Sequence, residues 1–192
     1  MRPALRIVPL ACAGALVLGG VARAEAASAT VKTDDGTFVI VLRPDLAPRH
    51  VAHFVKVARA GGYDGTVFHR IVPRGMIQGG DPLSKDPKKK ALYGTGGLGL
   101  LKAEFSEAPM VRGAVAAVLR PSSRDSAGSQ FFICLSDQAS LTGKFTIFGE
   151  VTSGMEIADA IGARPVAGDR ATERIVIRSV TIDAAPASPP AP

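Results

Sequence analysis

The chain has 192 residues, of which 46% are hydrophobic and 21% charged, and its formal net charge is +6. This length suits one domain of ordinary size with a real hydrophobic core, and a second domain is not needed. Three of the 23 basic residues and none of the 17 acidic ones lie in the first 24 positions. The remaining chain is therefore only mildly basic, which argues against a nucleic-acid-binding protein.

Residues 1–24 have the order of residues found in a secretory signal peptide. Arg2 and Arg6 precede an apolar run that ends near Val21, and Ala22-Arg23-Ala24 matches an A-x-A cleavage site. The alternative is a membrane anchor, but the apolar run is short and contains proline, whereas a spanning helix needs ~20 residues. We therefore expect cleavage near Ala24 and a periplasmic protein.

The cysteine content predicts a domain without a disulfide. Of the two cysteines, only Cys134 lies outside the predicted signal peptide, so the mature chain has no internal disulfide and its stability must come from packing. Because Cys134 lies in the apolar run FFICL, we interpret it as a small buried hydrophobic residue rather than a reactive thiol.

The first elements after the signal peptide are a hairpin and a helix. Strand-like runs at 29–33 and 37–42 flank Asp34-Asp35-Gly36, and an Asp-Gly pair between two such runs is typical of a hairpin turn. In the following segment the apolar residues Val51, Phe54, Val55 and Ala58 recur with helical spacing. Pro48 suits the first turn, so we predict an amphipathic helix of about three turns.

The remainder of the domain is predicted to be mostly strands. Strand-like runs occupy 66–72, 76–80, 113–119, 130–136, 145–151 and 174–182. A second helix is expected in SGMEIADAIG, with Ser153 and Glu156 as a capping box and Gly162 as its stop. The eight strands and two helices favour a mainly β fold, a closed eight-stranded antiparallel β-barrel capped by two α-helices. We assign 25–183 to this domain and 184–192 to a disordered Pro/Ala-rich tail.

Several motifs lack the residues that their usual functions require. The glycine loop at 94–99 lacks the strand, helix and Gly-Lys-Ser/Thr context of a phosphate loop, and the basic run at 85–90 is interpreted as a solvated loop. His50 and His53 lack a third metal ligand and are interpreted as surface histidines. Ser129 has no recognisable base and acid to activate it. We therefore expect neither a metal nor a cofactor.

Arg70 is the residue that these observations leave unexplained. At period 2 it would share one strand face with Phe68 and Val72, in an otherwise apolar run. Arginine cannot shed its proton, so its partial burial is costly unless partners or a task compensate. Two explanations stay open at this point, an ion pair with an acid such as Asp81 or Glu104, or a chemical role.

Several separated motifs resemble those of the cyclophilins, the peptidyl-prolyl cis-trans isomerase family. The segments are FHRIVPRGMIQGGD at 68–81, GTGG at 94–97, GSQFFIC at 128–134 and LTGKFTIFGEV at 141–151, and the likeness extends over 29–182. The resemblance implies an eight-stranded barrel, in agreement with the element count. It also implies an enzyme that rotates X-Pro peptide bonds in proline-containing polypeptide segments, without a cofactor.

The resemblance also implies roles for particular residues. Arg70 matches the catalytic arginine of the family, and the expected substrate-binding residues are Phe68, Met76, Gln78, Gln130, Phe132, Leu141 and Phe145. Among these, Met76, Phe132 and Leu141 are expected to receive the proline ring, and the two glutamines to hydrogen-bond near Arg70 or the peptide backbone. An apolar pocket with few polar groups is what recognition of X-Pro requires.

Four features depart from the family pattern. Gly75 stands where a pocket phenylalanine is usual, Ser140 replaces the tryptophan of cyclosporin-sensitive members, and Phe145 replaces a histidine or tyrosine. The segment 118–128 differs in length, so the pattern does not fix Val118 as a pocket residue. Two hypotheses follow: a monomeric periplasmic isomerase that assists folding of exported proteins, or a cyclophilin-fold binding module or chaperone with little turnover.

Overall fold

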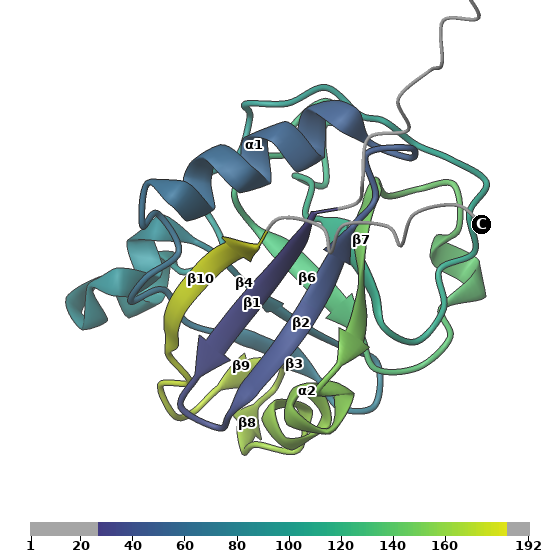
Figure 1. Cartoon of the computed structure of the whole chain (residues 1–192). Coiled ribbons are helices and arrows are strands. Elements are labelled where there is room, and N and C mark those ends of the chain that lie inside the picture. The colour runs from purple at the N-terminus through teal and green to yellow at the C-terminus, as the bar shows by residue number, and fades with distance from the viewer. Residues whose placement is uncertain (1–26, 184–192) are drawn as a thin grey trace, which may run out of the picture.

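The computed structural model describes residues 27–183 and consists of one antiparallel sheet with two α-helices (Figure 1). The predicted signal peptide at 1–24 and the predicted tail at 184–192 lie outside the described residues. Within 27–183 no helix has the length and apolar character that crossing a membrane requires.

Ten strands form the sheet, two more than the sequence predicted. Their bounds are β1 Ser28–Thr33, β2 Thr37–Leu42, β3 Arg70–Val72, β4 Met76–Gly79, β5 Ala114–Ala117, β6 Phe131–Cys134, β7 Ile147–Ser153, β8 Val166–Ala167, β9 Arg170–Ala171 and β10 Ile177–Asp183. The strand order is β10-β1-β2-β7-β5-β6-β4-β3-β9-β8, and every pairing is antiparallel. The additional strands β8 and β9 form a two-residue hairpin beside β3.

Backbone hydrogen bonds between the start of β10 and the segment before β3 close the sheet into a barrel. The Phe68 amide donates to the Ile175 carbonyl at 3.0 Å, and the Ile177 amide donates to the Thr66 carbonyl at 2.8 Å. These bonds join the segment before β3 to the start of β10. The predicted mainly β barrel is therefore confirmed, with the small β8–β9 hairpin added at its rim.

Helix α1, Pro48–Arg59, covers one open end of the barrel, and α2, Met155–Gly162, lies at the opposite end (Figure 1). Helix α1 buries Val51, Phe54 and Ala58, as its periodicity predicted. Its first turn is capped by the carboxylate of Glu104, which accepts from the amides of Arg49 and His50. A carboxylate at this position satisfies free N–H groups and complements the helix dipole.

The interpretation of His50 as a surface histidine is wrong, because this residue is 3% exposed and its Nδ1 lies 2.6 Å from Glu104 Oε2. The capping box predicted for the second helix is also absent. Ser153 is the last residue of β7, and the N-cap is Gly154 with φ 76°. A side chain at Gly154 would collide with the backbone of Thr37 and Phe38, so glycine is required where the chain turns sharply from strand into helix.

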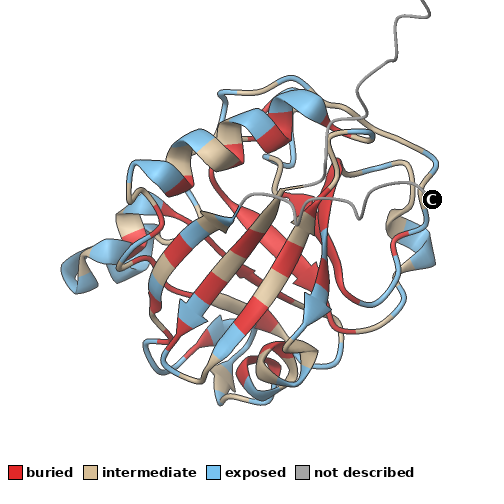
Figure 2. Ribbon diagram, viewed as in Figure 1, coloured by how far each residue is buried: buried red, intermediate tan, exposed pale blue. Residues whose placement is uncertain are grey.

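The barrel interior forms the hydrophobic core, and along the strands buried residues alternate with more exposed ones (Figure 2). Aromatic rings fill its centre: the Phe54 ring lies 5.0 Å from Tyr63 and 5.3 Å from Phe148, and Phe131 packs edge-on against Phe68 at 6.1 Å. Rings in these arrangements add specific contact energy to area burial. The sheet therefore provides a rigid base for side chains on its outer face.

Candidate active site

A row of four residues in register crosses the outer face of the sheet. Phe132 on β6 lies opposite Gln78 on β4, Gln78 lies opposite Arg70 on β3, and Arg70 lies opposite Arg170 on β9. Directly opposed residues of an antiparallel pair share one face of the sheet. All four line a cavity of about 620 Å³, which is the candidate active site.

Arg70 occupies the middle of this row. Its Nε donates to Asp169 Oδ2 at 2.6 Å and its Nη1 donates to Gln78 Oε1 at 3.3 Å. Within residues 27–183 its Nη2 makes no hydrogen bond. The guanidinium is thus held on two sides and presents its remaining N–H groups to the cavity.

Arg70 does form an ion pair, which was one of the two explanations that the sequence left open, but its partner is a different acid from the two suggested. The partner is Asp169 in the turn between β8 and β9, not Asp81 or Glu104. The Arg70 side chain is 39% exposed and that of Asp169 is 51% exposed, so this is a solvent-accessible ion pair. The hydrogen bond from Arg70 lowers the pKa of Asp169, which is therefore ionised at neutral pH.

A chain of side-chain amides continues from Arg70 into the protein. Gln78 Nε2 donates to Gln130 Oε1 at 3.0 Å, and Gln130 Nε2 donates to the Gly96 carbonyl at 2.7 Å. Both glutamines are buried. His69 adds a contact of 3.4 Å from its Nε2 to Gln78 Nε2, and burial lowers the pKa of its imidazole. A neutral His69 accepts from the Gln78 amide and so helps to aim Gln78 Oε1 at Arg70.

The glycine loop serves this network rather than a phosphate. The carboxylate of Asp81, which is fully buried, accepts from the amides of Gly94 at 2.6 Å and Gly96 at 3.2 Å. The N–H groups that would cradle a phosphate are thus already used. The loop instead fixes the Gly96 carbonyl in place to receive Gln130.

The end of the cavity next to Phe132 is apolar. Met76, Leu141 and Phe145 line it with Phe132, and the Phe132 and Phe145 rings meet edge-on at 5.3 Å. Val118 also lines the cavity, which settles a position that the sequence left open. The geometry of this end suits a small apolar ring.

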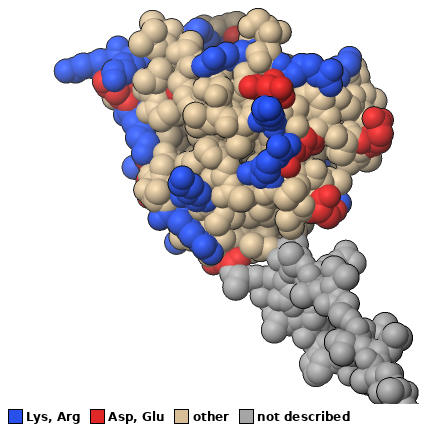
Figure 3. Space-filling model, turned by 90° about the horizontal axis from the view of Figure 1, so that it is seen from above, with Lys and Arg blue, Asp and Glu red and all other residues tan. Residues whose placement is uncertain are grey.

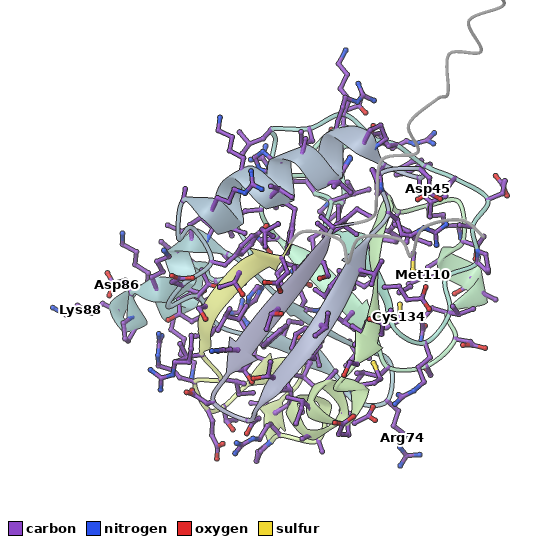
Figure 4. The ribbon with its side chains drawn as sticks, viewed as in Figure 1. Asp45, Arg74, Asp86, Lys88, Met110 and Cys134 are labelled. Carbon is purple, nitrogen blue, oxygen red and sulfur yellow. The ribbon has the colours of Figure 1, made fainter. Side chains whose placement is uncertain are left out.

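A second, smaller hydrophobic cluster supports this apolar end from below. It contains Met110, Cys134 and Ile147 together with Phe132, and it packs against the partly buried pocket residues. Met110 and Cys134 lie near each other in this cluster (Figure 4). Cys134 is fully buried and burial raises the pKa of its thiol to about 11. The interpretation of Cys134 as a buried hydrophobic residue is therefore confirmed.

The structure separates one predicted site residue from the others. Phe68 is fully buried, packs in the barrel core and does not line the cavity. Its expected place beside Arg70 assumed strict alternation, but Phe68 and Ile71 both face the core although they are three residues apart. The alternation is interrupted between them, before β3 begins. Phe68 therefore supports the barrel and is not placed to contact a substrate.

Gly75 lies in the turn between β3 and β4, directly before the cavity residue Met76. Its amide donates to the Val72 carbonyl at 2.8 Å, and its carbonyl accepts from the Leu135 amide at 2.8 Å. A Cβ atom at this position would lie 2.9 Å from Val72 Cγ1. Glycine therefore fits the tight turn between β3 and β4.

The sequence did not point to Asp169 or Arg170. They lie on strands or turns of only two residues, too short to show a periodic pattern. The glycine at position 168 was the available sequence signal for the turn that carries Asp169. In the structure this glycine has φ 68°. Among the described residues no group of three or more metal-ligating side chains comes together.

Comparison with known proteins agrees with this geometry. The family model of cyclophilin type peptidyl-prolyl cis-trans isomerases matches residues 28–182. A probable peptidyl-prolyl cis-trans isomerase of Brucella suis is 44% identical over 156 residues, covering 77% of this chain and 79% of that protein. Peptidyl-prolyl cis-trans isomerase B of Streptomyces anulatus is 39% identical over 180 residues, covering 83% of this chain and 98% of its own.

A solved structure gives the same result for the fold. The cyclophilin type isomerase of Cryptosporidium parvum, crystallised in the presence of the dipeptide Ala-Pro, superposes with a TM-score of 0.72 at 25% identity, covering 81% of this chain and 98% of that one. The matches in sequence and in fold extend over the barrel and over the residues that build the cavity. The chain therefore belongs to the cyclophilin family and is a peptidyl-prolyl cis-trans isomerase that acts on proline-containing peptides.

Proposed function

We propose that the protein is exported and isomerises X-Pro bonds in exported polypeptides as they fold, with Arg70 as the catalytic residue. The observation that carries the catalytic part is the position of Arg70 between an apolar pocket and its two anchors, Asp169 and Gln78. A proline ring in the apolar end would place its nitrogen near the free N–H groups of Arg70.

The chemistry of the X-Pro bond explains what Arg70 supplies. Conjugation gives the amide a rotation barrier of ~20 kcal/mol, and the uncatalysed exchange takes roughly 10 to 100 s. As the bond twists, conjugation is lost and the prolyl nitrogen gains lone-pair character. A donor aimed at this nitrogen stabilises the twisted state more than either planar state, which is differential binding of the transition state.

The anchors of Arg70 make this stabilisation effective. A guanidinium that is already oriented loses little freedom when the amide twists, so its hydrogen bond lowers the barrier without a reorganisation cost. A charged hydrogen bond is worth roughly 1.5–3 kcal/mol, and each ~1.4 kcal/mol is a factor of ten in rate. Arg70 alone would thus contribute roughly a 10- to 100-fold acceleration.

A turnover assay with a matched control tests the catalytic role. In a protease-coupled assay on an Ala-Pro peptide, we expect Arg70→Ala to lose most of the catalysed rate. Arg59→Ala, which removes an exposed arginine from the last turn of α1, should keep the rate of the unaltered protein. Equal rates for Arg70→Ala and the unaltered protein would contradict the proposal.

The proposed export depends on the N-terminal sequence. The basic start, the apolar run and Ala22-Arg23-Ala24 support removal of a signal peptide near Ala24 and a periplasmic location. The N-terminal residue of protein recovered from cell fractions tests this directly. We expect Glu25 as the first residue in the periplasmic fraction, and retention of Met1 in the cytoplasmic fraction would overturn the export proposal without affecting the isomerase activity.

A further inference from the structure

The cavity continues past Arg70 into a second end that is rich in positive charge. This cationic end consists of Lys90 in η2 (Pro87–Leu92), Arg170 in β9 and Arg174 before β10, all of which line the cavity. Their hydrogen bonds run to neutral oxygens: Arg174 donates to the Tyr93 hydroxyl at 2.8 Å, and Arg170 donates to the Lys90 carbonyl at 3.4 Å. Within residues 27–183, none of the three lies in a salt bridge.

The acidic residues in the same wall do not neutralise these cations. Asp169 is bonded to Arg70 at 2.6 Å, and Glu173 is bonded to Arg164 at 3.0 Å. Arg164 is shared with Asp35, so Glu173 has no cation of its own. The cavity wall nevertheless has four cations, Arg70, Lys90, Arg170 and Arg174, against the two carboxylates Asp169 and Glu173. A wall with an excess of one sign of charge concentrates ligands of the opposite sign.

The position of Arg170 is unfavourable for the fold alone. It lies directly opposite Arg70 in the pairing of β3 with β9, and like charges at opposed positions of a sheet destabilise it. Asp169 is hydrogen-bonded to Arg70 and not to Arg170, on which its charge acts only through space. A ligand with a negative charge would turn this arrangement from a cost into a binding contribution.

We propose that the cationic end is a subsite for a carboxylate side chain, aspartate or glutamate, of the same polypeptide whose proline occupies the apolar end. The enzyme would then prefer X-Pro bonds that have an acidic residue a short distance away. Arginine and lysine suit this task because they bind carboxylates by charge-assisted hydrogen bonds.

The row across the sheet sets the spacing between the proline and the acidic residue. Opposed residues on neighbouring strands lie ~5 Å apart, and three such steps separate Phe132 from Arg170, or about 15 Å. An extended chain advances ~3.3 Å per residue, so the carboxylate should lie about four residues from the proline.

The basic run at 85–90 is thus divided between two environments. Lys90 lines the cavity, whereas Lys88 and Asp86 lie at the outer tip of the segment and point away from the barrel (Figure 4). In the space-filling view, basic side chains project at the same left-hand edge of the molecule (Figure 3). The lysines of this run are exposed, as the sequence predicted, but Lys90 also lines the cavity and Lys88 does not, so Lys88 provides a matched control.

Paired peptides test the subsite. The catalysed exchange is measured for peptides that carry glutamate or the isosteric glutamine four residues before, or four residues after, the proline. Because the cations are exposed and screened by solvent, we expect kcat/KM for the glutamate peptide to exceed that of its glutamine partner by about five-fold in one of the two series at low salt. In 0.5 M NaCl this ratio should fall to nearly one.

Variants assign the preference to the cationic end. Lys90→Gln and Arg170→Gln should each reduce the glutamate-to-glutamine ratio, while Lys88→Gln should leave it as in the unaltered protein. Lys90 is exposed, so its variant keeps the fold, and the salt dependence is measured on the unaltered protein. A ratio near one in both series, or a ratio that neither Lys90→Gln nor Arg170→Gln reduces, overturns the proposal. Turnover of the glutamine peptides reports isomerase activity separately.

Discussion

Removal of the Asp169 carboxylate should impair the catalysed step more than it impairs folding. Both members of the Arg70–Asp169 pair are about half exposed, so the pair stabilises the fold by at most ~1 kcal/mol. Its role in orientation is larger, because a misplacement of ~1 Å in a positioned group can cost roughly 100-fold in rate. Since Gln78 still holds Nη1, we expect Asp169→Ala to lower kcat by about 10-fold with KM changed less than about two-fold.

Two further variants separate positioning from general destabilisation. Asp169→Asn keeps an acceptor oxygen for Arg70 Nε and should lose only about three-fold in kcat, because a neutral acceptor forms a weaker hydrogen bond than a carboxylate. Asp159 on α2 is a similarly exposed carboxylate that forms an ion pair with Arg112, and neither residue lines the cavity. Asp159→Ala should therefore keep the kcat of the unaltered protein. Equal kcat values for Asp169→Ala and the unaltered protein would refute the positioning role.

The pH dependence follows from the direction of the Asp169 shift. Arg70 holds the pKa of this carboxyl below its ordinary value, so the pair stabilises the fold above that ordinary value of ~3.9 and the contribution is lost as the pH falls through the lowered value. Asp169 therefore stays ionised from pH 5 to pH 8 and holds Arg70 in the same way throughout this range. The ratio of the kcat of the unaltered protein to that of Asp169→Asn should accordingly stay constant from pH 5 to pH 8. A ratio that changes across this range would contradict the assignment.

The remaining predictions concern the loop, the core and an inhibitor. Asp81→Ala should lower the free energy of unfolding by roughly 3 kcal/mol, measured by urea denaturation, because the partly buried N–H groups of Gly94 and Gly96 lose their acceptor; an unchanged midpoint would contradict this. Cys134 should react with a thiol reagent at pH 8 only after unfolding, because its native pKa is about 11, and rapid reaction of the folded protein would show that it is not buried. Ser140, which stands where cyclosporin-sensitive members have tryptophan, should make cyclosporin a weak inhibitor in the turnover assay; a nanomolar inhibition constant would refute this.

The sequence predicted those parts of the fold whose signals are local. The Asp-Gly turn between β1 and β2 and the helical spacing in α1 are set by neighbouring residues, and both are present in the structure. The second helix was placed correctly, but its start was not, because the sharp turn after β7 required a glycine with positive φ rather than a capping serine.

The parts that the sequence missed depend on contacts between distant segments. Asp169 and Arg70 are 99 positions apart, and only the β8–β9 hairpin brings them together. Phe68 was misplaced because a break in the strand alternation cannot be read from an apolar run. The position of Lys90 in the cavity wall likewise follows from the path of η2, not from the composition of its segment.

The central claim is that Arg70 stabilises the twisted amide and contributes little to binding of the planar substrate. NMR exchange measurements on an Ala-Pro peptide report both quantities, the catalysed cis-trans exchange rate and the dissociation constant. For Arg70→Ala we expect the exchange rate of the bound peptide to fall by roughly 10- to 100-fold while the dissociation constant changes by less than about three-fold. A dissociation constant that rises as much as the rate falls, or an exchange rate that is unchanged, would contradict the account.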